Sequence, residues 1–531
     1  MRAKRWLAVF LALMLLAFLC TAALTAYVDP FFHYHAPLTD RFFYVIDNER
    51  SQNDGILRHF DYDAVVTGTS MTANFSTSEL DVLFGTHSVK VPASGGTAYE
   101  IGGLIETALR AQPKVKTVFR SIDRHLFLFG SSRLRGDLGE YPSYLYDDSL
   151  LNDYKYLLNA DVAFGRAGKM LLQSADPGFA PGITSFDDYA NTMQEYEGQF
   201  GLPELESMLS YPPGKVGYPM PLTDNMRLAL TESIEEGVVA PAKAHPEVTF
   251  YCFFPPYSLG FWSEKVASGE ISALLEAEKL AAELMLECDN IRLYDFDCRL
   301  DILSDVNHYR DLMHYGEWVN SLILKWMHED AYRLTKENYR QRLEDEAAYY
   351  LEADYSSLLT AERYGCDYYA AALVNEELTG QAPRAIGAEE LLAGELRHAQ
   401  LEPDEAGEGL ILTCLGTLPR EPGEGLAEYL RDCDYIGLKL SLPDAADYSY
   451  LCFQGRNMAL NGQPAVFVYD EAGNTVEAFA GDYRDLQGGW QRFAVDLRKA
   501  RGPVEIVFQG GYTDCTGSEG AAFAFRDFML Y

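Results

Sequence analysis

The stretch Tyr62-Asp-Ala-Val-Val-Thr-Gly-Thr-Ser70 decides how this chain of 531 residues folds. Residues 64–67 form a short apolar run that predicts a buried strand, and Gly68-Thr-Ser70 predicts a sharp turn into a helix. Ser70 then stands at the carboxyl end of a strand, where its hydroxyl is exposed and the N–H groups of the next helix point toward a developing anion. Turn serines and helix caps are a common alternative, so Ser70 alone does not establish a function.

The chain around this stretch alternates between strand and helix patterns. Further strands are predicted at 87–91, 115–122, 248–254 and 291–296, and helices at 76–83, 99–111, 271–286 and 316–327. This alternation predicts an α/β fold of three layers, a parallel sheet of the flavodoxin-like kind with helices on both faces. The loops that follow the strands should meet at one edge of the sheet, where ligands bind in such folds.

A second polar group falls at the same predicted edge, after the strand at 291–296. The segment Val306-Asn-His-Tyr-Arg-Asp311-Leu-Met-His314 places Asp311 and His314 three residues apart, so both can face one serine. A histidine takes the proton of a serine hydroxyl, and a carboxylate fixes the tautomer of the imidazole. His308 is a competing base on the same loop, and the sequence does not decide between the two histidines.

The N-terminus predicts a membrane anchor. Arg2, Lys4 and Arg5 precede an uncharged apolar stretch from Trp6 to about Val28, which suits a bilayer span. The basic start predicts a cytoplasmic N-terminus with the bulk of the chain outside the cell. An uncleaved signal anchor is favoured, and a cleaved signal is the alternative because small residues occur at 23–26.

The amino-acid composition argues against several classes of binding partner. The formal net charge of −36 argues against nucleic acid and against a polybasic grip on anionic lipid. His33 and His35 have the spacing of metal ligands, but no third ligand stands nearby, and none of the nine cysteines has a zinc-like spacing. The sequence therefore predicts neither a metal site nor a cofactor.

The rest of the chain divides into an insertion, a connector and a second domain. An insertion at about 133–243 carries aromatic loops that can stack on sugars or form a lid. Residues 331–409 read as a helical connector and linker, and 410–531 as short alternating strands of an all-β, jelly-roll-like sandwich. Trp490 is either part of its core or a sugar platform. The predicted domains are thus 1–28, 29–330, 331–409 and 410–531.

Three blocks of this sequence resemble SGNH (GDSL-type) hydrolases. They are Gly68-Thr-Ser70 after the first strand, Gly95-Gly96 after the second, and Asp311-Leu-Met-His314 after the last. The likeness is to the membrane-anchored, extracytoplasmic branch, such as the proteins of teichoic-acid D-alanylation and alginate-type O-acetylation. The C-terminal domain is similar to carbohydrate-binding modules. The resemblance implies that Ser70 is the nucleophile, His314 the base and Asp311 its orienter, with an oxyanion hole built from the N–H groups of Ser70 and of Gly95 or Gly96.

One block departs from the family pattern. Where the family has a Gly-x-Asn-Asp turn, this chain has Arg120-Ser-Ile-Asp123, without the asparagine that donates to the oxyanion. Losing one such donor costs about two to three orders of magnitude in rate. Either Arg120, Ser121 or Asp123 substitutes for the asparagine, or the enzyme is slow, or catalysis has been lost.

The sequence predicts an extracytoplasmic serine-dependent acyl esterase or O-acyltransferase that acts on a cell-envelope or exopolysaccharide glycan. Its expected partners are a glycan or acylated polymer, the membrane, and a membrane-bound acyltransferase as acyl donor. The alternative is a catalytically inactive SGNH-fold protein that binds glycan or acts as a scaffold of polysaccharide assembly.

Overall fold

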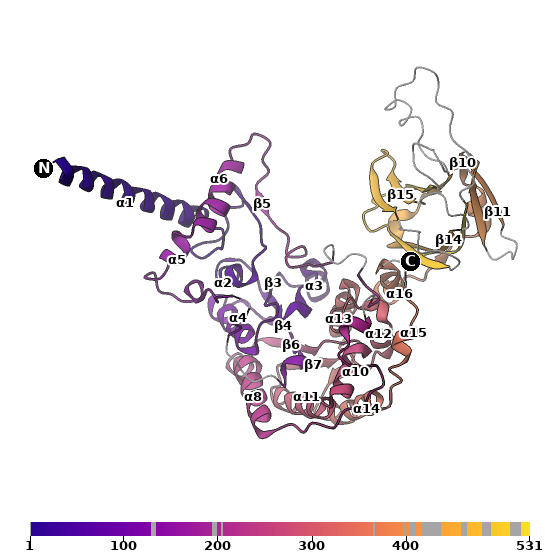
Figure 1. The fold of residues 1–531 in the computed structure, drawn as a ribbon, viewed down its shortest axis with the longest axis horizontal. Coiled ribbons are helices and arrows are strands. Elements are labelled where there is room, and N and C mark those ends of the chain that lie inside the picture. Colours follow the sequence, from indigo (N-terminus) through magenta and orange to yellow (C-terminus); the bar gives the residue numbers. More distant parts are fainter. Residues whose placement is uncertain are drawn as a thin grey trace, which may run out of the picture. The chain divides into compact units, whose positions relative to one another are not determined.

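A computed structural model describes residues 2–128, 134–137, 139–193, 199–202, 205–364, 367–397, 399–403, 409–415, 437–457, 465–480, 490–509 and 522–531. The chain forms two compact units (Figure 1). The first comprises Met1–Tyr196, Glu204–Asp305 and Tyr309–Thr360, and the second comprises Glu197–Pro203, Val306–His308 and Ala361–Tyr531.

The first unit is built on a six-stranded sheet with the order β3-β2-β4-β6-β7-β8. Five strands are parallel, and the short edge strand β8 is antiparallel to β7. All residues of β2 and β3 are buried, as expected for strands covered on both faces. The order of the five parallel strands is that of flavodoxin-like folds, which confirms the predicted class. The strands are β2 (Ala64–Gly68), β3 (Ser88–Pro92), β4 (Thr117–Ser121), β6 (Thr249–Phe254), β7 (Ile291–Asp295) and β8 (Arg333–Leu334).

Helices cover the two faces of this sheet (Figure 1). In one helix layer, α2 contacts α4, the π-helix η5 contacts both α4 and α8, and α8 contacts α11. In the helix layer on the other face, α3 packs against α13. The first layer contains α2 (Glu49–His59), α4 (Ala98–Ala111), α8 (Asp224–Ile234), η5 (Glu235–Val239) and α11 (Ile271–Met285), and the second α3 (Thr77–Phe84) and α13 (Glu317–His328).

The predicted insertion lies between β4 and β6. It supplies α8, η5 and α9 (Ala240–Ala244) to the first helix layer, and β5 (Gly182–Ile183), which pairs in parallel with β1 (Phe43–Tyr44). It also contains three short helical segments, α5 (Tyr154–Leu157), η4 (Asp161–Gly168) and α6 (Lys169–Gln173). Of these, α5 and η4 contact the end of the N-terminal helix.

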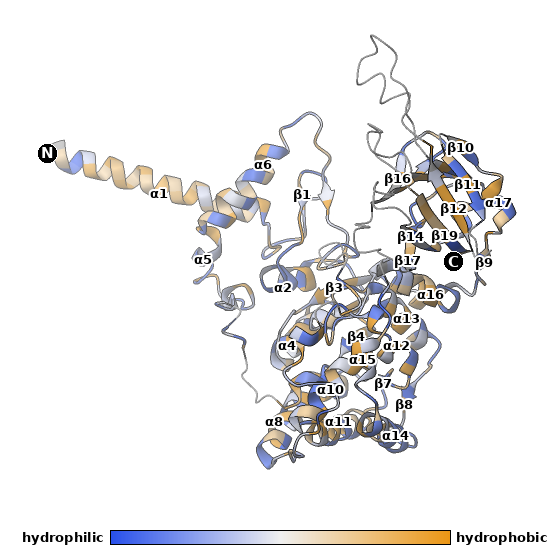
Figure 2. Ribbon diagram, turned by 45° about the vertical axis from the view of Figure 1, so that its right-hand side comes forward, coloured by the Kyte–Doolittle hydropathy of each residue, from blue (hydrophilic) through white to orange (hydrophobic). Residues whose placement is uncertain are grey.

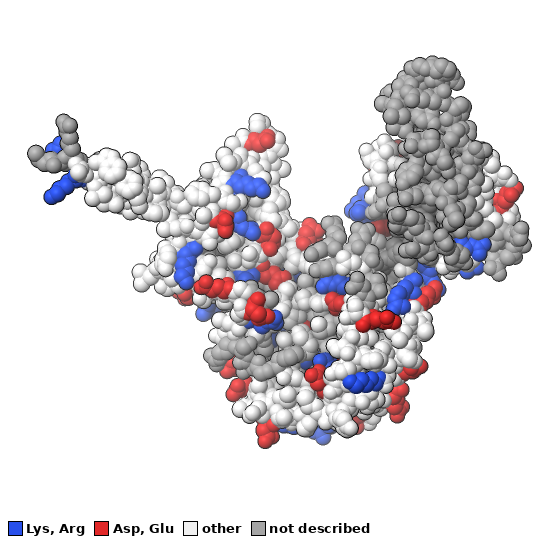
Figure 3. Space-filling model, in the orientation of Figure 1, with Lys and Arg blue, Asp and Glu red and all other residues white. Residues whose placement is uncertain are grey.

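The N-terminal helix α1 (Arg2–Val28) is the one helix of the described residues that is long and apolar enough to cross a membrane. Figure 2 shows its hydrophobic length, and Figure 3 shows charged side chains only near its start. Residues 3–20 are exposed, whereas residues 21–28 are partly covered. An apolar helix that packs on nothing over most of its length fits a signal anchor or a signal peptide, but not a core helix.

The second unit contains two antiparallel sheets with the orders β10-β13-β18-β15-β16 and β11-β12-β19-β14-β17. One hydrophobic cluster, which includes Leu412, Phe453, Val468 and Ile506, draws residues from both sheets, as in a β-sandwich. The strands are β12 (Leu410–Cys414), β13 (Gly437–Leu442), β14 (Tyr450–Asn457), β15 (Ala465–Asp470), β16 (Thr475–Ala480), β17 (Gln491–Asp496), β18 (Val504–Gln509) and β19 (Ala522–Leu530).

The connector differs from its prediction. In the first unit, α14 (Tyr339–Glu352) packs on α11, and α15 (Ser357–Thr360) follows, whereas α16 (Asp367–Thr379) belongs to the second unit. The segment expected to be a linker forms β9 (Arg384–Ala385), β10 (Glu395–Arg397) and β11 (Ala399–Pro403), which pair with strands of the sandwich. These edge strands are short and carry few core residues, so they lack the alternation that marks a strand in sequence.

Candidate active site

Ser70 begins a 3-10 turn, Ser70–Thr72, directly after β2. Thr69 caps this turn by accepting a hydrogen bond from the N–H of Met71. Gly68 is required just before it, because a Cβ atom at Gly68 would lie 2.2 Å from the Oγ of Ser121 and 2.8 Å from Thr72. The close approach of β4 therefore fixes where the chain leaves the sheet, and it leaves Ser70 half-buried at the carboxyl edge.

Ser70, His314 and Asp311 form one hydrogen-bonded chain. The Oγ of Ser70 lies 2.7 Å from Nε2 of His314, and Nδ1 of His314 lies 2.8 Å from Oδ2 and 3.0 Å from Oδ1 of Asp311. A carboxylate only accepts, so Nδ1 carries the proton and Nε2 is left to accept the hydroxyl proton of Ser70. The arrangement has the geometry of a serine–histidine–aspartate triad.

Asp311 is held as an anion. Its Oδ1 also accepts the N–H groups of Met313 and His314. Burial raises the pKa of Asp311, but the hydrogen bond and charge of His314, with the two N–H groups, outweigh burial and lower this pKa below its ordinary value. Arg310 adds a contact of 3.3 Å to Oδ2. A carboxylate fixed in this way keeps the imidazole in one tautomer.

His308, the other histidine considered as the base, is not part of the hydrogen-bonded chain of Ser70, His314 and Asp311. His308 lies buried in the 3-10 turn Val306–His308 and does not line the cavity in front of Ser70, whereas His314 does. The loop between them folds back through a bridge of Tyr309 with Tyr315, so His308 and His314 are not equivalent.

A cavity of about 340 Å³ opens at Ser70. Several of its polar lining residues were missed from the sequence because they come from separate elements: Asn74 from the loop after the Ser70 turn, Glu49 from the start of α2 and Asn320 from the first turn of α13. Among them, Asn74 accepts hydrogen bonds at Oδ1 from Thr192, and Asn320 donates to the carbonyl of Met71. Glu49 accepts from the N–H and Oγ of Ser94. Their spacing from Ser70 in sequence gives no signal apart from Asn74, which follows four residues later.

The two glycines predicted to donate to the oxyanion, Gly95 and Gly96, differ in their backbone conformation and hydrogen bonds. The N–H of Gly96 donates to the carbonyl of Ala93 at 2.8 Å and closes a turn, so the structure contradicts its use as a donor in this conformation. Gly95 occupies the left-handed region with φ 65°, which explains the need for glycine there. Ser70, at the start of its turn, lines the cavity and offers its N–H there, whereas Gly95 is not among the lining residues, so its role as a donor stays a prediction.

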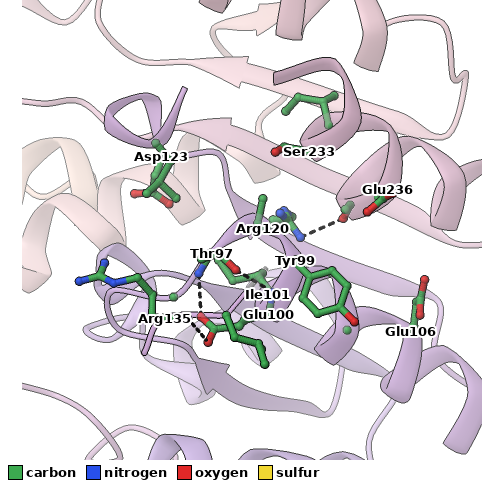
Figure 4. A pocket seen from close by; sticks show the side chains of 18 of the residues that line it. Thr97, Tyr99, Glu100, Ile101, Glu106, Arg120, Asp123, Arg135, Ser233 and Glu236 are labelled. Atoms are coloured by element: carbon green, nitrogen blue, oxygen red, sulfur yellow. Dashed lines mark hydrogen bonds between the residues drawn. The ribbon is translucent and has the colours of Figure 1, made fainter. Parts of the chain in front are cut away.

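None of the three proposed substitutes for the missing asparagine lines the cavity at Ser70 as the structure describes it. Ser121 donates to Asp123 at 2.7 Å, and Asp123 also accepts from Tyr257. Arg120 instead borders a separate cavity of about 1110 Å³, where it donates to the carbonyl of Gly237 (Figure 4). Burial lowers the pKa of Arg120 to about 10. The expectation that one of them replaces the donor therefore stays a prediction, and none of the three borders the cavity at Ser70.

A buried lysine supports the loop that carries Asn74. Lys90, on β3, donates to the carbonyls of Ala73 and Phe75 at 2.5 and 2.9 Å. Burial lowers the pKa of Lys90 to about 7. With its side chain between two carbonyls, Lys90 ties the loop after Ser70 to the sheet.

Arg124 lies at the centre of a buried charge cluster in the first unit. Its guanidinium contacts Glu278 at 2.6 Å, Asp295 at 2.9 Å and Asp297 at 3.2 Å, all almost fully buried. Oxygens of Glu278, Asp295 and Glu346 lie within 4.8 Å of one another, a spacing that can hold a cation. Arg124 already pairs with two of the three, so a structural role for the cluster is sufficient. This charge network was not foreseen from the sequence.

The other predicted positions are placed as follows. His33 contacts Asp153, and His35 contacts the carbonyls of Ala26 and Ala36, so the two are not arranged around a metal. Trp490 is half-buried and lies near Arg456 and Arg526, 5.1 and 4.2 Å from its ring centre, and it is not part of the sandwich core. Cys20, Cys252, Cys288 and Cys298 are free thiols.

Comparisons with known proteins find structural likeness only. No family model matches the chain, and no curated protein matches it. A structure proposed to be a platelet activating factor from Streptococcus pneumonia is similar over 53% of this chain and 88% of its own, with 10% identity and a TM-score of 0.27. A variant of a family 29 carbohydrate-binding module covers 28% of this chain and 92% of its own, with 12% identity and a TM-score of 0.17. The module CsCBM6-3 from Clostridium stercorarium, in complex with cellobiose, covers 28% and 91%, with 10% identity and a TM-score of 0.17.

Proposed function

We propose that this protein is a serine-dependent acyl esterase or O-acyltransferase of the SGNH type that acts on a cell-envelope glycan outside the cell. The observation that carries the proposal is the chain of hydrogen bonds from Ser70 through His314 to Asp311. The apolar helix α1 supports a membrane-anchored location, and the sandwich supports a glycan as partner. A membrane-bound acyltransferase would supply the acyl group if the reaction is a transfer.

The proposed reaction has two halves. His314 Nε2 takes the proton of Ser70 while Oγ bonds to the carbonyl carbon of the ester. The tetrahedral oxyanion collapses, the ester C–O bond breaks, and His314 returns the proton to the departing alcohol. Water or a sugar hydroxyl then gives its proton to His314 and attacks the acyl-Ser70. The second tetrahedral oxyanion collapses, the bond between Oγ of Ser70 and the acyl carbon breaks, and His314 gives its proton to Oγ. The product is either a carboxylic acid or a new ester.

We propose that Asn74 supplies the side-chain donor that the third block lacks. Its Oδ1 is held by the N–H and hydroxyl of Thr192, so the Nδ2 end is left for the cavity that it shares with Ser70. Replacing Asn74 with alanine is expected to lower kcat by about 10²- to 10³-fold, the cost of losing one oxyanion donor.

Steady-state ester hydrolysis measures this effect, with Asn191→Ala as the matched control. Asn191 lines the same cavity, but its amide donates to Glu317. A similar loss of kcat in both variants would show that Asn74 acts only by shaping the loop.

A fluorophosphonate probe tests the proposed function. The wild type is expected to be labelled at Ser70, and the Ser70→Ala variant is not, because the probe traps a serine that a histidine activates. The melting temperature of both proteins is measured alongside, since Ser70→Ala removes only one half-buried hydroxyl. Well-folded wild-type protein that is not labelled would refute the enzyme and favour the inactive glycan-binding alternative.

A further inference from the structure

We infer that the segment 150–172 is a second membrane contact, which dips into the outer leaflet of the bilayer beside α1. The inference rests on the proposal that α1 is an uncleaved anchor. Six large apolar side chains of this segment are exposed, and we call them the leaflet patch: Leu150, Leu151, Tyr154, Phe164, Leu171 and Leu172. Leu151 is 90% exposed and Leu172 is 78% exposed, which is unfavourable in water.

The length of α1 places this segment at the level of the bilayer. A hydrocarbon core of about 30 Å needs about 20 helical residues. Arg2, Lys4 and Arg5 belong in the cytoplasmic headgroup region, so the span begins near Trp6 and reaches about Thr25. The helix stands free of the protein only up to Cys20, and residues 21–28 are partly covered. The last turns of the span therefore lie where the protein already surrounds the helix.

The segment that covers these last turns is the one that carries the leaflet patch. Both α5 and η4 contact α1, and the hydroxyl of Thr25 donates to the carbonyl of Leu157 at 3.1 Å. In the bilayer, α5 and η4 therefore lie at the same depth as Thr25. An apolar surface at that depth is in contact with lipid, which explains why it is not covered by protein.

Contacts after α1 hold the segment at a fixed height. Asp29 is fully buried and accepts the hydroxyl of Tyr156 at 2.7 Å as well as three backbone N–H groups. Phe31 packs in one cluster with Leu145, Tyr156 and Val162. The chain directly after the span is thus bonded to the segment through a buried carboxylate and an aromatic core, so helix and leaflet patch move as one body.

The experiment uses the full chain in liposomes of neutral phospholipid that carry a quencher in the upper part of the acyl chain. A fluorescent amino acid is incorporated at Leu151 or Leu172 in the leaflet patch, at Leu19 in the span, or at Val216 as a control. Val216 is also exposed, at 77%, but its neighbour Gly217 is bonded to Val266 of α10 (Leu259–Ser268), away from α1.

Fluorescence is expected to be lost at Leu19, Leu151 and Leu172 and kept at Val216. Loss at Leu19 alone would overturn the inference and leave the anchor intact. Loss at none of the four would overturn the anchor and the inference with it. Loss at all four would show that the quencher does not discriminate the patch from the rest of the surface, and the inference would fall.

Discussion

Replacing His314 with glutamine is expected to lower kcat/KM for ester hydrolysis by about 10⁴-fold. Glutamine preserves much of the volume but cannot take the proton from Ser70, which lies 2.7 Å from Nε2. The remaining rate comes from substrate binding and the oxyanion donors alone. Stopped assays with a chromogenic ester, normalised to folded protein, measure the loss.

His308→Gln is the matched control, since both histidines lie on one loop. His308 is buried and is not among the residues that line the cavity, so its replacement is expected to lower the melting temperature while kcat/KM of the folded fraction changes by less than about tenfold. The reverse pattern, with His308 essential and His314 dispensable, would contradict the triad.

Replacing Arg124 with methionine is expected to destabilise the protein by at least about 3–5 kcal/mol, because it leaves buried carboxylates without their guanidinium. Glu278, Asp295 and Asp297 all contact Arg124, and none is more than 1% exposed. Urea denaturation measures the change. Arg227→Met is the control: its ion pair with Glu276 is on the surface, so the expected effect is about 0–1 kcal/mol.

The loss at Arg124 should depend on pH. Burial raises the pKa of Glu278 to about 7 even though Arg124 lowers it, so removing Arg124 raises this pKa further. A carboxyl group whose pKa is higher in the folded state destabilises folding above its ordinary pKa and ceases to do so when protonated. The Arg124→Met deficit is therefore expected to be largest near pH 8 and to shrink toward pH 5. A deficit that does not change over this range would contradict the assignment.

The sequence was sufficient to predict the elements whose residues repeat with a simple period or spacing. The apolar run before Gly68 and its counterparts predicted the parallel sheet, and Asp311 and His314 were identified because their spacing matches a required geometry. Asn74 and Glu49 were not, because a single polar residue in a loop or at the start of a helix has no pattern until the elements are placed together. The hypothesis that Arg120 substitutes as a donor meets a related difficulty. Sequence order put it beside Ser70, but its side chain points to the helix layer and bonds Gly237.

The hydrogen bond between Ser70 and His314 joins residues 244 positions apart, and this separation has a consequence for folding. Contacts of such long range form late, because the chain must close a large loop before they repay its entropy. As the chain emerges N-terminus first, β2 and its serine are present long before the loop that carries the base. Until α13 docks, Ser70 is an ordinary alcohol with no group to take its proton. In the proposed mechanism, the hydroxyl therefore becomes a nucleophile only when the α/β unit is complete, and a partly folded chain would be chemically inert.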